Sequence, residues 1–182
     1  MSQNAGSYYH NAIVYPMECN NDFKKLGCAY VLSPLHSPDA DDGEAPKIHN
    51  HIMFRCGRKM TGIAFQQMCY DKLGADYGKG FSYCPEMCVV TSPDHYLRYM
   101  IHLDDLDKQQ FKLNYLELEL YGVWVKELLS AFDDIITQDI LRDVEHCKTS
   151  VTELKNNPLY CAWLRKGYNL ALVNTIRREI NH

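Results

Sequence analysis

The spacing of the apolar residues changes near residue 112, and this change constrains the fold more than any other feature of the sequence. Before it, apolar residues come in short runs rich in β-branched and aromatic side chains, bounded by proline or glycine. After it, they recur at helical spacing. Examples are Leu113, Leu116, Leu120, Val123 and Leu128. We therefore expect a mixed domain over residues 1–112 and a small all-α domain over residues 113–182.

The first part combines strands and helices. Expected strands cover residues 8–15, 28–32, 47–55 and 87–90, and expected helices cover residues 20–26, 60–73 and 93–101. The acidic, proline-containing loop 37–46 joins the second and third strands and favours an antiparallel hairpin. The order β-α-β-β-α-β-α indicates an α+β fold, in which an antiparallel sheet carries helices on one side, as in ferredoxin-like domains.

Composition excludes several classes of protein. A hydrophobic fraction of 46% is enough for a core, so we do not expect a disordered chain. There is no apolar run of about 18 residues and no basic, apolar start, so we expect neither a membrane span nor a secretory signal. The eight cysteines lack the two-residue spacing of zinc sites, which indicates reduced thiols and a cytoplasmic location. A net charge of −4 argues against coating nucleic acid by bulk charge.

Two histidines share one face of an expected strand. His49 and His51 lie two residues apart in Lys47–Phe54, and side chains at that spacing project together. For such a pair alone, two solvated surface histidines are the favoured interpretation. However, His36 and Asp39 follow the second strand, and a hairpin would bring them near the pair. Three nitrogens and one oxygen suit manganese, and magnesium or zinc less characteristically.

A tyrosine-containing helix is the second feature with chemical potential. Tyr96, Tyr99 and His102 are three residues apart, so they lie on one face of a helix. Tyrosines at this spacing usually pack against a sheet with their hydroxyls at its rim. Beside a metal site, they would also offer a phenol nucleophile.

Four separated segments resemble the small-plasmid rolling-circle replication initiators (Rep proteins) of the HUH endonuclease superfamily. The segments are Tyr15-Pro16, Ser33-Pro34-Leu35-His36-x-x-Asp39, Lys47-x-His49-x-His51 and Tyr99-x-x-His102. They occur in order between residues 8 and 111. The resemblance implies an RRM-like HUH endonuclease domain for the first part and an oligomerisation domain for the second. It also implies site residues: metal ligands His36, Asp39, His49 and His51, the nucleophile Tyr99, and auxiliary roles for His102 and Tyr96.

The resemblance further implies a metal-dependent, site-specific DNA nickase and strand-transferase. Such a protein binds a plasmid origin, at a nick site exposed in a hairpin and at adjacent duplex repeats. With Mn²⁺ or Mg²⁺ bound, its tyrosine attacks one strand, which leaves a 5′-phosphotyrosine link and a free 3′-hydroxyl primer, and strands are rejoined at termination. The implied partners are origin DNA, further copies of the chain, and a host helicase and polymerase, with no membrane.

Seven cations near these segments are candidates for contact with DNA phosphates. They are Lys47, Arg55, Arg58, Lys59, Lys72, Lys79 and Arg98. Each alone is more often a plain surface cation. Three other functions stay open: a single-tyrosine HUH transposase, a relaxase-type strand transferase, and a non-catalytic DNA-binding module of the same fold.

Overall fold

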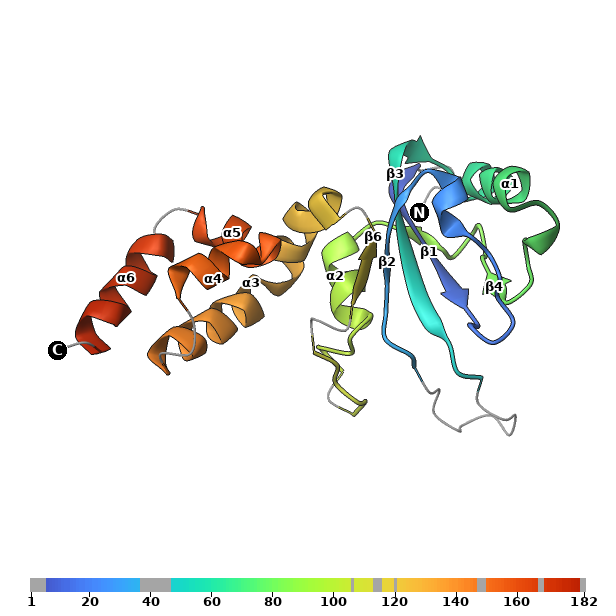
Figure 1. Ribbon diagram of the computed structural model, residues 1–182. Coiled ribbons are helices and arrows are strands. Elements are labelled where there is room, and N and C mark those ends of the chain that lie inside the picture. Colours follow the sequence, from blue (N-terminus) through green and yellow to red (C-terminus); the bar gives the residue numbers. More distant parts are fainter. Residues whose placement is uncertain are drawn as a thin grey trace. The chain divides into compact units, whose positions relative to one another are not determined.

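A computed structural model describes residues 6–36, 47–105, 107–112, 116–119, 121–146, 150–166 and 169–180. The chain divides into two compact units, Met1–Tyr121 and Gly122–His182. The first unit contains the sheet and the second is helical (Figure 1). No helix among the described residues is long and apolar enough to cross a membrane.

An antiparallel sheet forms the frame of the first unit (Figure 1). Its strands are β1 (Ser7–Val14), β2 (Ala29–Leu32), β3 (Asn50–Met60), β4 (Phe81–Ser82), β5 (Val89–Val90) and β6 (Glu117–Glu119). The strand order is β4-β1-β3-β2-β6, and β5 also pairs with β1. The helical segments are η1 (Phe23–Leu26), α1 (Gly62–Leu73), η2 (Gly74–Asp76) and α2 (Pro93–Tyr99). The predicted α+β class and antiparallel sheet are confirmed.

The two helices of this unit lie on opposite faces of the sheet (Figure 1). Phe54 of β3 contacts Phe65 of α1 on one face, whereas His51 of β3 contacts Tyr99 of α2 on the other. Successive side chains of a strand project to opposite faces. This corrects the expectation of helices on one side. The face that carries His51 also has apolar residues such as Met53, which is fully buried. Packing of α2 on this face keeps such residues out of water.

Two short strands were not expected from the sequence. β4 contributes two residues, and β6 occupies a segment where the apolar spacing predicted helix from residue 113 onwards. The helical prediction is wrong for Glu117–Glu119, which pairs with β2. The alternation Glu117-Leu118-Glu119 has the period of a strand, but three residues are too few to outweigh a helical stripe in the surrounding sequence. The predicted boundary at residue 112 precedes this last strand of the sheet.

The second unit consists of α3 (Tyr121–Glu145), α4 (Val151–Asn156), α5 (Pro158–Leu164) and α6 (Asn169–Ile180). Its helical character is as predicted. Residues at helical spacing along α3 are buried; they are Trp124, Leu128, Phe132, Ile136, Ile140 and Val144. On α5, Trp163 is also buried, and its indole N–H donates to Thr137 Oγ1 of α3 at 2.8 Å. This contact ties α5 to α3.

Candidate metal centre and tyrosine site

Strand β3 and the residue that precedes it hold two imidazoles on one face. His51 lies within β3 and His49 just before it, and residues two apart point the same way. Ile52 and Phe54 are fully buried in the core on the opposite face, so they fix the strand. The backbone N–H of His51 also donates to Ser33 Oγ at 2.8 Å. The sheet therefore sets the direction of both histidines.

A change of register brings the third imidazole to the same face. Leu32 of β2 pairs with Ile52 of β3. In constant register, Leu35 would lie opposite His49, but it is His36 that forms an antiparallel bridge with His49. One extra residue on the β2 side therefore turns His36 toward the pair, as a β-bulge does.

The three imidazoles converge. One ring nitrogen from each of His36, His49 and His51 lies within 4.8 Å of the others. Their ring centroids are 4.7 Å (His36–His51), 5.0 Å (His49–His51) and 5.8 Å (His36–His49) apart. The fourth ligand expected from the sequence, Asp39, lies outside the described residues. Whether Asp39 joins the set stays a prediction.

Carbonyl groups orient two of the rings from the outside. His36 Nε2–H donates to the Met100 carbonyl at 3.0 Å, and His49 Nδ1–H donates to the Lys47 carbonyl at 3.1 Å. Each bond leaves the other nitrogen of the ring with a lone pair. Histidine ligands of metal ions commonly have such an outer partner. The donor set therefore fits a divalent first-row ion, which His36, His49 and His51 would hold.

Burial keeps two of these rings uncharged. His36 and His51 are 3% and 6% exposed. Burial, together with the neighbouring imidazoles, lowers the pKa of His36 to about 4 and that of His51 to about 3. Both are therefore neutral at pH 7, which is the form that binds metal.

Helix α2 places two tyrosines beside this cluster. Tyr99 is 43% exposed, and its ring centroid lies 5.0 Å from that of His51. Tyr96 is more deeply placed, with its hydroxyl 3.5 Å from His51 Nδ1, and burial raises its pKa. Leu97 lies between the two tyrosines in the sequence. Its side chain is fully buried and anchors the helix. Tyr99 is thus the accessible phenol, and Tyr96 supports the ring of His51.

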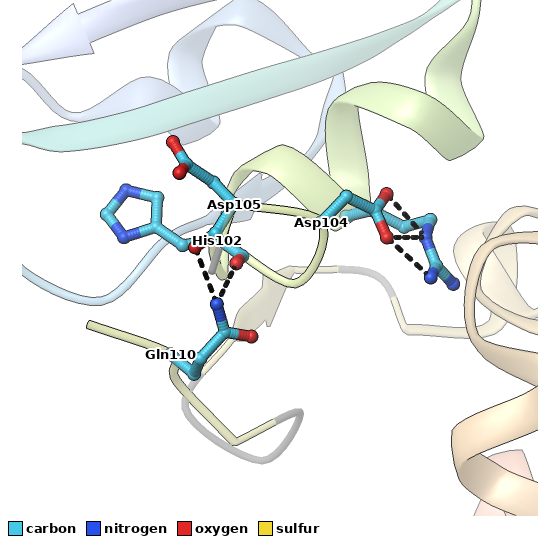
Figure 2. Close-up of polar contacts among 5 residues, drawn as sticks. His102, Asp104, Asp105 and Gln110 are labelled. Atoms are coloured by element: carbon cyan, nitrogen blue, oxygen red, sulfur yellow. Dashed lines mark hydrogen bonds and ion pairs between the residues drawn. The ribbon is translucent and has the colours of Figure 1, made fainter. Parts of the chain in front are cut away.

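The turn after α2 is held by its own polar contacts (Figure 2). The Gln110 side chain donates to the carbonyls of His102 at 2.6 Å and Asp105 at 2.7 Å. His102 has a positive φ of 55°, which is uncommon for a residue with a Cβ. Its ring lies 4.2 Å from that of His36, and its Nδ1–H donates to the Gln109 carbonyl at 3.0 Å. These bonds hold His102 against the histidine cluster.

Two of the seven candidate cations lie near this site. Lys47 is exposed just before His49, and its amine lies 5.7 Å from the Tyr15 ring centroid and 4.0 Å from a Glu18 carboxylate oxygen. Arg98 of α2 pairs with Asp104 at 2.7 Å. The Asp104 carboxylate therefore already binds the Arg98 guanidinium.

The other five cations are spread over the first unit. Arg55 is half-buried within β3, and Arg58 and Lys59 are exposed toward its end. Lys72 lies in the last turn of α1, which packs on the face away from the histidines. Lys79 pairs with the last residue of η2 at 3.6 Å. The seven do not form one cluster, and their contact with DNA stays a prediction.

A hollow of about 320 Å³ lies next to Tyr99. Asn11 of β1 and His95 of α2 line it, and neither was among the residues expected to function. The sequence did carry a signal. Ser92, His95, Tyr96 and Tyr99 follow the i, i+3, i+4, i+7 pattern of one helix face, and all four line the hollow.

Comparison with known families identifies the chain. The family model described as "Plasmid replication protein, origin binding domain" matches residues 4–122, which is more than half of the chain. A search of curated proteins found no match to the chain. The matched range contains the whole sheet, the three histidines and both tyrosines of α2. The chain therefore belongs to the plasmid replication protein, origin binding domain family, and its role is that of a plasmid replication initiator that binds origin DNA.

Proposed function

We propose that this initiator nicks and rejoins one strand of its origin as a metal-dependent endonuclease of the HUH type. The single observation that carries the proposal is the placement of an exposed tyrosine, Tyr99, beside three convergent histidine nitrogens on one face of the sheet. A binding module needs no such phenol next to a metal donor set. The match to an origin-binding family supplies the substrate, origin DNA.

The reaction exchanges one phosphodiester bond for another. The phenolic oxygen of Tyr99 attacks the scissile phosphorus and stays joined to the 5′ phosphate, and the 3′ oxygen leaves and takes up a proton. His36, His49 and His51 would hold a divalent ion, Mn²⁺ or Mg²⁺, which would supply positive charge for the phosphate oxygens. Because the phosphodiester energy is kept in the phosphotyrosine link, attack by a 3′ hydroxyl can later rejoin the strand.

The phenolic proton needs an acceptor. A tyrosine with an ordinary pKa of about 10 is protonated near pH 7. We assign this role to His102, whose ring centroid lies 6.3 Å from that of Tyr99. Its Nδ1–H donates to the Gln109 carbonyl, so Nε2 is the nitrogen with a lone pair. In this proposal, the proton of the Tyr99 hydroxyl passes to His102 Nε2, directly or through one water molecule.

A covalent-adduct assay tests the proposal. The protein is incubated with a single strand that carries the origin nick site, with Mn²⁺ or with EDTA, and the products are separated under denaturing conditions. We expect a protein–DNA adduct with Mn²⁺ that disappears in Tyr99→Phe, because only the phenolic oxygen is removed. Tyr70→Phe is the matched control and should retain the adduct, because Tyr70 is an exposed residue of α1, on the other face of the sheet. An undiminished adduct in Tyr99→Phe would overturn the assignment of the nucleophile. If the native chain forms no adduct, the nickase proposal is wrong and the chain is a non-catalytic DNA-binding module.

We also propose that the helical unit assembles several copies of the chain at the origin. Leu170 and Leu172 of α6 are 37% and 39% exposed, although this unit has a buried core of its own. A net charge of −4 gives little bulk attraction to DNA, so several copies acting together would raise the affinity. A host helicase and polymerase would then use the free 3′ hydroxyl.

A further inference from the structure

The hollow beside Tyr99 has the size and lining of a site for one nucleobase. Its volume of about 320 Å³ is at the small end of ligand pockets, which suits a ligand as small as one base. Among the described residues that line it, none is lysine or arginine. A hollow without such cations is poorly suited to a phosphate group and better suited to an uncharged ligand.

Two aromatic rings form part of the lining. Tyr96 and Tyr99 both line the hollow, and their ring centroids are 5.7 Å apart with an angle of 42° between the planes. Unpaired bases bind proteins largely by stacking on such rings. Because Tyr99 is 43% exposed, its ring is accessible to a base that enters from solvent.

The side-chain amide of Asn11 is a polar group in the lining that can form a hydrogen bond to a base. Asn11 lies on β1, on the sheet face away from its neighbour Ala12, which is buried in the α1-side core. Its side chain lines the hollow and has no hydrogen-bond partner among the described residues. An amide offers both a donor and an acceptor, as does the edge of a base. Ser92 and His95 add further polar groups to the same lining.

We propose that this hollow binds one unpaired base of the strand that Tyr99 attacks, with stacking on the tyrosines and a hydrogen bond to Asn11. This inference rests on the proposed function for the identity of the strand. The base would hold the neighbouring phosphate in register with the phenolic oxygen. Asn11 is then a positioning residue, since it acts on the substrate without touching the reacting atoms.

Photo-crosslinking tests the site without any nicking. Full-length protein in EDTA is irradiated with a fluorescein-labelled short oligothymidylate in which a central base is 5-iodouracil. Trypsin cuts after Lys79 and Arg98, so residues 80–98 and the peptide that begins at Tyr99 report directly on the hollow. We expect the crosslink in one of these two peptides, or beside Asn11 in the tryptic peptide of residues 1–24. A crosslink elsewhere, or no crosslink, overturns the proposal.

A matched pair of variants separates a specific site from general affinity. Asn11→Ala should lower the crosslink yield about fivefold, the effect of losing one hydrogen bond. It should leave the fold intact, because the amide has no partner among the described residues. Asn20→Ala, which changes an exposed asparagine in the loop after β1, should leave the yield unchanged. Equal yields for Asn11→Ala and the native chain contradict the proposal.

The two proposals fail in distinguishable ways. A protein that crosslinks at the hollow but forms no adduct with Mn²⁺ would refute the nickase and keep the base site. A protein that forms the adduct through Tyr99 but crosslinks elsewhere would refute the base site alone.

Discussion

At the scale of single residues, the sheet uses histidine in two ways on its two faces. On the α2 face, three imidazoles share a small space and keep one nitrogen each available. On the α1 face, His10 is fully buried and stacks on Phe65 with ring centroids 4.3 Å apart. Its Nδ1 is hydrogen-bonded to Tyr83 Oη at 2.9 Å. We propose that the first set binds a metal ion, whereas His10 is part of the core.

His10 makes stability depend on pH. Burial lowers its pKa from 6.5 to about 4, so between these values the unfolded chain binds a proton that the native chain does not. The free energy of unfolding therefore falls as the pH drops from 6.5 toward 4. In His10→Phe, we expect the loss between pH 7 and pH 5 to be smaller by about 2 kcal/mol than in the native chain.

Urea unfolding in EDTA at the two pH values measures this difference. The histidines of the cluster are present in both proteins, so their contribution cancels in the comparison. Equal losses of stability in His10→Phe and the native chain would show that the His10 pKa is not lowered in the fold.

Some residues of the candidate site could be predicted from the sequence, and others could not, for physical reasons. The period of two along a strand predicted that His49 and His51 share a face. The approach of His36 depends on one extra residue in the β2 side of the hairpin, which only the register reveals. Asn11 was missed because its neighbour across the hollow, His95, is distant in sequence and becomes adjacent only through the sheet.

At the scale of elements, long periodic segments were predictable and short strands were not. α1, α2 and β1 lie close to their expected ranges, because each has enough residues to show a period or clear end signals. β4 and β6 have two and three residues, and their conformation is set by pairing with β1 and β2. Short strands of this kind carry little local signal.

Strand β6 predicts where the first unit can be cut. Its residues pair with Tyr30, Val31 and Leu32 of β2, and Leu116 just before it is buried. We expect a fragment of residues 1–121 to melt at least about 5 °C higher than a fragment of residues 1–112, because the shorter one exposes the edge of β2.

Thermal unfolding of the two fragments, followed by circular dichroism in one buffer, provides the comparison. Equal melting temperatures would mean that β6 adds nothing to the sheet and would favour the boundary at residue 112.

At the scale of the whole molecule, origin binding belongs to the first unit and assembly is assigned to the second. The family match ends at residue 122, close to the division of the chain into two compact units. Light scattering after size-exclusion chromatography should give the full chain a mass that is a multiple of 21.1 kDa. The fragment 1–121 should be monomeric. A full chain that stays at one chain mass at high concentration contradicts assembly.

The central claim is that His36, His49 and His51 form a divalent metal centre next to Tyr99. Anomalous X-ray scattering at the manganese absorption edge, from crystals of the native chain grown with Mn²⁺, tests it most directly. The account predicts one strong peak bounded by the three histidine nitrogens, with the Tyr99 ring beside it. Crystals that bind Mn²⁺ elsewhere, or show no peak among these histidines at saturating Mn²⁺, would contradict it.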